Sequence, residues 1–155
     1  MYPSKYAAAH PDRAAFIMAS TGESVSYVEF EARANKLTHL LQNEGLGRQD
    51  HYSIMMENNN RYLEACAAGE RAGLYYTCIN SFLTADELAY ILDNSESQIL
   101  ITSMSKLEVA IEAVAQSSKV RKVLVVDADA NELPNGFEDY ATACQSFPAT
   151  PIDDE

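Results

Sequence analysis

The sequence has no long apolar run and few basic residues, and each scarcity argues against a class of protein. No stretch of 18 apolar residues occurs, and residues 1–16 lack the uninterrupted apolar segment of a signal peptide. The chain carries 11 Lys and Arg against 23 Asp and Glu, a net charge of −12 that repels nucleic-acid phosphates and anionic lipids. We therefore expect a cytoplasmic protein with no nucleic-acid partner and no integral membrane association.

Cysteine is also scarce. The three cysteines, Cys66, Cys78 and Cys144, are an odd number and show no CxxC spacing. This pattern predicts a reducing compartment and neither a disulfide framework nor a zinc site. We expect all three to be buried thiols that pack as small hydrophobic side chains.

Three glycine-dependent motifs are missing as well. The sequence contains no GxGxxG or GxxxxGK[ST] phosphate cradle and no GxSxG nucleophile elbow. His10, His39 and His51 are scattered, and none has a spaced Cys or carboxylate partner that would indicate a metal site or a catalytic triad. The residues alone therefore identify no catalytic, cofactor-binding or metal-binding residue.

The composition itself is that of one globular domain. The 155 residues are 47% hydrophobic and 22% charged, which suffices for a single core without disulfide or metal. Residues 123–155 hold eight acidic residues and no basic ones, and residues 148–155 include two prolines. We predict an α/β domain over residues 1–147 and an acidic linker or truncated end over residues 148–155.

Capping boxes mark three helix starts, because a Ser or Thr and a Glu three residues later can bind each other's backbone N–H groups. The pairs are Ser26 and Glu29, Thr84 and Glu87, and Ser105 and Glu108. The first helix is predicted to end near residue 44, before Gly45. A further helix, from residue 59 or 60 to residue 71, has many small residues suited to close packing and precedes Gly73.

Short β-rich runs lie between these helices, at residues 52–56, 74–79, 98–102 and 122–126. They are typical of strands that are buried on both faces. Alternation of strands with helices predicts an α/β fold of βαβ units, with a mostly parallel sheet and helices on both faces. Residues 14–19 and 23–26 predict a peripheral hairpin. A turn at residues 134–136 followed by a short helix over residues 137–143 completes the prediction.

Ligands of such a sheet bind outside the carboxyl ends of the strands. Glu57 follows one predicted strand, and Asp127 and Asp129 follow another, so these carboxylates could together hold Mg²⁺. The alternative is that they are solvated strand ends, with residues 57–60 capping the next helix. Carboxylates without a nucleophile, a base or an anion cradle do not make an active site.

Four segments, in order, carry a resemblance to a known family. They read AHPDRA at residues 9–14, VSYVEF at 25–30, RAGLYYTCIN at 71–80 and LTADELAYIL at 83–92. The chain resembles the N-terminal portion of the adenylate-forming (AMP-binding) superfamily, especially its fatty-acid-CoA ligase-like acyl-CoA synthetases. The resemblance covers about residues 9–102. It implies the N-terminal subdomain of the adenylate-forming ligase fold.

The resemblance also implies a reaction. Such enzymes activate a carboxylic acid with MgATP, release pyrophosphate and pass the acyl-adenylate to the thiol of CoA. ATP, Mg and CoA are therefore implied for a parent enzyme, with the remainder of the same polypeptide as the partner of this part. Asn80 favours an acid activated as its CoA thioester, whereas Cys78 and Phe82 depart from the residues common at those positions.

The family's phosphate loop ending in Pro-Lys-Gly, its aromatic-Gly-x-Thr-Glu segment, its ribose-binding Asp and its catalytic Lys have no match in the sequence. No catalytic residue is carried over, and residues 1–155 alone are predicted to be inactive. Exposed apolar surface would favour self-association, such as a homodimer. The alternative hypothesis is a self-standing α/β binding or regulatory domain, with Glu57, Asp127 and Asp129 around a divalent ion.

Overall fold

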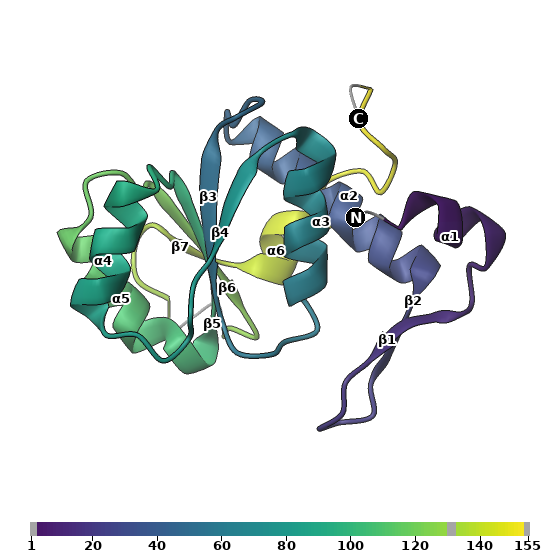
Figure 1. The fold of residues 1–155 in the computed structure, drawn as a ribbon, viewed down its shortest axis with the longest axis horizontal. Helices are drawn as coiled ribbons and strands as arrows, with labels where there is room; N and C mark the ends of the chain where they lie inside the picture. Colours follow the sequence, from purple (N-terminus) through teal and green to yellow (C-terminus); the bar gives the residue numbers. More distant parts are fainter. Residues whose placement is uncertain (1–2, 130–132, 154–155) are drawn as a thin grey trace.

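A five-stranded parallel sheet lies at the centre of the computed structural model, which describes residues 3–129 and 133–153 (Figure 1). The strand order is β4-β3-β5-β6-β7, and every neighbouring pair is parallel. The strands are β3 (His51–Met55), β4 (Tyr75–Cys78), β5 (Ile99–Ser103), β6 (Lys122–Val126) and β7 (Phe137–Asp139). The predicted α/β class and the mostly parallel sheet are confirmed.

Helices cover both faces of this sheet, as predicted (Figure 1). One face is covered by α2 (Tyr27–Asn43), α3 (Tyr62–Ala72) and α6 (Tyr140–Gln145), and the other by α4 (Ala85–Asn94) and α5 (Leu107–Gln116). Because alternate residues of each strand point to opposite faces, neighbours such as Leu124 and Val125 of β6 belong to two separate core clusters.

The hairpin of β1 (Ala14–Ile17) and β2 (Ser24–Ser26) is antiparallel and stands apart from the main sheet (Figure 1). Its turn contains Gly22 at a φ of 76°, a conformation that glycine adopts without strain. Phe16 of β1 meets Phe30 of α2 edge to face, with ring centroids 5.9 Å apart. The predicted peripheral hairpin is therefore confirmed and is fixed to α2 by aromatic packing.

Two of the three capping boxes form. The Ser26 side chain accepts a hydrogen bond from the Glu29 N–H at the start of α2, and Thr84 does the same for Glu87 at the start of α4. At α3, Gly73 takes the left-handed conformation, with a φ of 64°, and ends the helix as predicted.

The box predicted at Ser105 is wrong. Residues 104–106 form a 3₁₀ turn, η1 (Met104–Lys106), and α5 starts after it without a side-chain cap. The Ser105 hydroxyl instead donates a hydrogen bond to the Glu57 carboxylate, 2.7 Å away. A partner from a distant part of the chain thus replaces the local one.

Four other details differ from the sequence prediction. Helix α3 begins at Tyr62 and not at residue 59 or 60, because the Asn59 side chain accepts the Arg61 N–H in a turn before the helix. Residues 137–139 form a strand that pairs with β6, and α6 follows it. Strand β4 is partly exposed because it is an edge strand. The short α1 (Ser4–Ala9) was not predicted.

The end of the described chain lies along α2. Asn35 of α2 donates to the Ala149 carbonyl at 2.8 Å, and a ring nitrogen of His39 lies 2.9 Å from the Thr150 carbonyl oxygen. Ile152 is buried in the core cluster under α2 and α3. The division of the chain at residue 147 stays a prediction, as does the linker character of residues 148–155.

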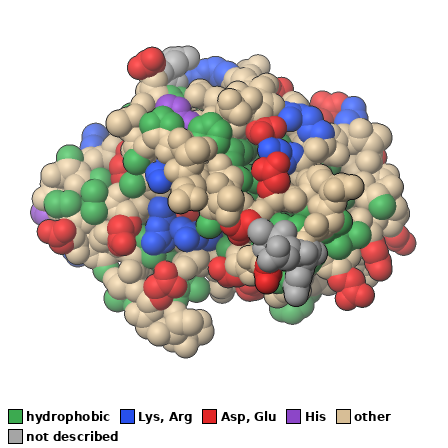
Figure 2. All heavy atoms as spheres, turned by 180° about the vertical axis from the view of Figure 1, so that it is seen from behind, with side chains coloured by type: hydrophobic (Ala, Val, Ile, Leu, Met, Phe, Trp, Pro, Cys, Tyr) green, Lys and Arg blue, Asp and Glu red, His purple; other side chains and the backbone are tan. Residues whose placement is uncertain are grey.

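The surface carries many acidic side chains, in keeping with the net charge of −12. On the face seen in Figure 2, Lys and Arg side chains nevertheless lie together near the middle. Among the described residues, no helix is both long enough and apolar enough to cross a membrane.

Candidate functional site

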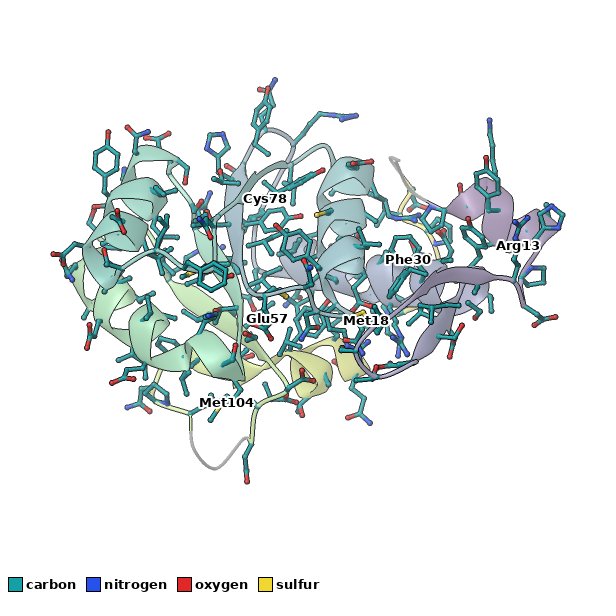
Figure 3. All side chains as sticks on the ribbon, turned by 60° about the horizontal axis from the view of Figure 1, so that its bottom comes forward. Arg13, Met18, Phe30, Glu57, Cys78 and Met104 are labelled. Atoms are coloured by element: carbon teal, nitrogen blue, oxygen red, sulfur yellow. The ribbon has the colours of Figure 1, made fainter. Side chains whose placement is uncertain are left out.

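The strand order defines where a ligand of this sheet would bind. From β3 the chain crosses to β4 on one side, and from β4 it returns to β5 on the other side of β3. The switch point therefore lies between the carboxyl ends of β3 and β5. Glu57 follows β3 and lies at the same end of the sheet as Met104, which follows β5 (Figure 3).

The Glu57 carboxylate is fixed at this switch point by hydroxyl groups of β5 and η1. One of its oxygens accepts hydrogen bonds from Ser103 Oγ at 2.6 Å and from Ser105 Oγ at 2.7 Å. Partial burial acts to raise the pKa of Glu57, but these hydrogen bonds outweigh it and hold the pKa below its ordinary value. Glu57 is therefore an ionised acceptor that joins the ends of β3 and β5.

Asp127 has a different partner. It follows β6, with a φ of 58°, and its carboxylate accepts a hydrogen bond from Asn59 Nδ2 at 3.1 Å. This bond links the loop after β3 to the loop after β6. Asp127 is thus a structural acceptor at the carboxyl edge of the sheet.

The structure does not group Glu57, Asp127 and Asp129 around one ion. Among residues 3–129 and 133–153, no three His, Cys, Asp or Glu side chains are placed to hold a metal ion. The divalent-ion hypothesis is wrong in that form, because serine hydroxyls bind Glu57 and an asparagine amide binds Asp127.

The three histidines lie on different elements and are not brought together. His10 follows α1 and is exposed. His51 Nδ1 lies 2.5 Å from the Ser95 carbonyl oxygen, and the His51 ring packs edge to face on Tyr75. His39 contacts the Thr150 carbonyl. Two of the three thus contact backbone carbonyls.

The cysteines are all free, but they are not all buried. Cys144 is buried, Cys66 is half-buried and Cys78 is exposed, so the prediction of three buried thiols is wrong for Cys78. Burial raises the pKa of Cys144 to about 12 and, together with the neighbouring Cys78, raises that of Cys66 to about 12. Cys66 and Cys144 are therefore protonated and poorly reactive at neutral pH.

Asn80 and Phe82 occupy the turn between β4 and α4. The Asn80 side chain accepts the Phe82 N–H at 3.0 Å, which shapes this turn before the cap at Thr84. Phe82 is 89% exposed, and Lys106 Nζ lies 5.3 Å from the centroid of its ring. The role of Asn80 in selecting a substrate stays a prediction.

One cavity lined by several charged residues was not predicted from the sequence. A cavity of about 430 Å³ opens between α2, α3 and α6. Its lining residues are Arg33, Lys36, Arg61, Glu64, Tyr140, Ala141, Thr142, Cys144 and Gln145. We call it the basic pocket, because it holds three cationic side chains and one carboxylate.

Glu64 lines the basic pocket and is 1% exposed. Its carboxylate accepts a hydrogen bond from the Tyr140 hydroxyl at 2.8 Å and lies 3.4 Å from Arg61 Nη1. Burial raises the pKa of Glu64, although Arg61 and Tyr140 oppose the shift. Burial also raises the pKa of Tyr140, so its hydroxyl keeps the proton that it donates.

No local motif could have predicted this pocket. Arg33 and Lys36 come from α2, Arg61 precedes α3, and Tyr140 begins a helix that starts later than the sequence pattern predicts. Two pairs, Arg33 with Lys36 and Arg61 with Glu64, are three residues apart, which places the members of each pair on one side of a helix or helix start but does not bring the pairs together.

Comparison with known proteins identifies the family. A model described as AMP-binding enzyme matches residues 4–154. The chain belongs to the AMP-binding enzyme family. The predicted resemblance is therefore confirmed.

Relatives of the chain include CoA ligases and a linear gramicidin synthase. A 3-oxocholest-4-en-26-oate–CoA ligase of Rhodococcus rhodochrous is 30% identical over 148 residues, which are 93% of this chain and 26% of that protein. A linear gramicidin synthase of Brevibacillus parabrevis is 31% identical over 108 residues, which are 70% of this chain and 2% of that protein. The chain thus spans about a quarter of the CoA ligase and a far smaller share of the synthase.

Solved structures of AMP-binding enzymes share the fold. A fatty acyl CoA synthetase of Mycobacterium tuberculosis superposes with a TM-score of 0.82 at 21% identity, covering 99% of this chain and 29% of that one. Coronafacic acid ligase of Pectobacterium brasiliense gives a TM-score of 0.84 at 16% identity, again over 99% of this chain and 29% of that one. The predicted N-terminal subdomain of the adenylate-forming ligase fold is therefore confirmed.

Proposed function

We propose that this chain is the N-terminal part of an ATP-dependent acid–thiol ligase that makes acyl-CoA from a carboxylic acid, of the fatty-acid class. In the first step the carboxylate displaces pyrophosphate from ATP and becomes an acyl-adenylate. In the second step the CoA thiol displaces AMP and gives the thioester. The observation that carries this proposal is the 30% identity to a CoA ligase over 93% of the chain.

An amino-acid-activating enzyme is the second candidate, because the linear gramicidin synthase is similar over 70% of the chain. Two features favour the CoA ligase. The match to the Rhodococcus ligase extends over more of this chain, and Asn80 stands where the peptide synthetases usually have Asp. The Asn80 side chain is exposed, and among the described residues it accepts only the local hydrogen bond from the Phe82 N–H. A ligand could therefore bind Asn80 without displacing a buried contact.

The residues present do not by themselves fit MgATP. The sequence has no glycine-rich phosphate cradle, and the described residues hold no group of three His, Cys, Asp or Glu side chains for a metal ion. We therefore propose that residues 1–155 alone are inactive. Its proposed role is to pack against the remainder of the same polypeptide in a cytoplasmic enzyme, which leaves apolar surface for self-association when it is alone.

The first experiment is to read the coding DNA beyond the codon for Glu155. The proposal expects an open frame that continues into a Ser/Thr/Gly-rich loop ending in Pro-Lys-Gly. A stop codon directly after Glu155 would favour the self-standing domain and would withdraw the ligase function.

The second experiment measures acid-dependent exchange between ATP and pyrophosphate. The complete gene product is expected to catalyse exchange with fatty acids, whereas residues 1–155 alone are expected to show none. Exchange with amino acids only would favour the peptide synthetase class. Exchange by residues 1–155 alone would contradict the inactivity proposed here, since the site for the transferred phosphates would then lie within them.

A further inference from the structure

The basic pocket contains more positive charges than are required to balance the charge of its one carboxylate. Three of the chain's 11 Lys and Arg residues line it, against the single carboxylate of Glu64. On a chain with a net charge of −12, this concentration of cations in one cavity raises the local potential for anions.

The Glu64 carboxylate has its partners without Arg33 and Lys36. Arg61 pairs with the carboxylate at 3.4 Å, and the Tyr140 hydroxyl donates to it at 2.8 Å. Arg33 acts on Glu64 only through its charge, because none of the hydrogen bonds or ion pairs seen among the described residues joins them. Arg33 also acts on Glu29 through its charge, but neither Arg33 nor Lys36 forms an ion pair seen among the described residues, so both are available to an anion in the pocket.

Arg33 also has an unused donor. Its Nη1 atom is buried and lacks a hydrogen-bond partner in the described parts of the chain. A buried guanidinium donor without a partner costs free energy, so an acceptor that met Nη1 after rotation of the Arg33 side chain toward the pocket would be stabilised. Lys36 stands one helical turn further along α2 and lines the same cavity.

The pocket lies where ligands of a parallel sheet are expected. Arg61 stands between the carboxyl end of β3 and α3, and Tyr140 directly follows β7. Both positions are at the carboxyl edge of the sheet, on the face covered by α2. The cavity is nevertheless separate from Glu57, which is absent from its lining and bound to serines.

We propose that the basic pocket binds the phosphate group of a small organic phosphate monoester. A planar guanidinium with free donors and a lysine ammonium are the side chains that recognise phosphate in proteins. The volume of about 430 Å³ is within the range of small-molecule sites and leaves room for the organic part of an ester. This proposal goes beyond the ligase function and does not depend on it.

The test measures binding of phenyl phosphate to the complete gene product by isothermal titration calorimetry. Arg33→Gln and Lys36→Gln are each expected to weaken the affinity at least tenfold. Lys119→Gln, which removes an exposed lysine outside the pocket, is the matched control and is expected to leave the affinity unchanged. Thermal melts without ligand confirm that each variant folds.

Two further comparisons define the ligand. Affinity should rise between pH 5 and pH 7 as the monoester becomes a dianion, whose second pKa is about 6. Arg33→Lys keeps the charge but loses the planar donors. It should therefore bind phenyl phosphate more tightly than Arg33→Gln does, but less tightly than the unsubstituted protein. Phenyl phosphate should bind more tightly than inorganic phosphate.

Three results would overturn the proposal. They are the absence of saturable binding at millimolar phenyl phosphate, an affinity that neither Arg33→Gln nor Lys36→Gln changes, and equal affinity for inorganic phosphate. Failure here would leave the ligase function untouched, because the exchange assay with fatty acids reports on that function separately.

Discussion

Glu57 shows how one side chain holds two strand ends together. Its carboxylate follows β3 and accepts hydroxyl hydrogen bonds from Ser103 and Ser105, which lie at the end of β5 and in η1. These bonds hold the pKa of Glu57 below its ordinary value of 4.5, against the opposing effect of burial. The ionised form therefore stabilises the fold fully above pH 4.5, and this stabilisation is lost as the pH falls through the lowered pKa.

Glu57→Gln is expected to lower the free energy of unfolding at pH 7 by on the order of 1 kcal/mol, the typical net value of a hydrogen bond. Urea denaturation at pH 7 and pH 3.5 measures the effect. The difference from the unsubstituted protein should shrink at the lower pH, which lies below the ordinary value of 4.5 and closer to the lowered pKa of Glu57. Glu108→Gln, an exposed carboxylate of α5, is the control. A difference that stays constant with pH would show that the charge of Glu57 does not stabilise the fold.

At the scale of elements, the close approach of α3 to the sheet depends on its small residues. Gly69 lies against two tyrosines, and a Cβ there would be 2.9 Å from Tyr52 Cε1 and 2.9 Å from Tyr76 Cδ1. The Tyr52 hydroxyl donates to the Ala65 carbonyl at 2.5 Å, so that the ring cannot move away without losing this bond. The sequence prediction of a closely packed helix is explained by this contact.

Gly69→Ala is therefore expected to destabilise the protein by about 1–3 kcal/mol through overpacking, although alanine favours helix by about 1 kcal/mol. Chemical denaturation of the purified variant measures the change. Gly47→Ala is the matched control, because a Cβ there would meet only Asp50 Oδ2, at an ordinary 3.7 Å. Stabilisation by Gly69→Ala would mean that helix propensity outweighs packing at this position.

At the scale of the whole molecule, sequence patterns predicted the structural features that depend only on residues close together in the sequence. The caps at Ser26 and Thr84 and the helix end at Gly73 are local devices, and all three form. The cap at Ser105 fails because Glu57, 48 residues earlier, binds the same hydroxyl. Residues 137–139 form a strand because they pair with β6.

The basic pocket could not be predicted for the same reason. Its side chains come from α2, α3 and α6, which meet only when the sheet is assembled. The carboxylates that the sequence did single out, Glu57 and Asp127, lie at the predicted edge of the sheet but bind different partners. The sequence thus predicted that these carboxylates lie at the carboxyl edge of the parallel sheet, but it did not predict which side chains they bind.

The most direct test of the central claim is the product formed by the complete gene product from ATP, CoA and a series of fatty acids. Mass spectrometry should detect the acyl-CoA thioester together with AMP, in equal amounts and only when all three substrates are present. An aminoacyl-adenylate formed without a CoA thioester, or no acid-dependent AMP at all, would contradict the proposal that this chain belongs to an acyl-CoA ligase.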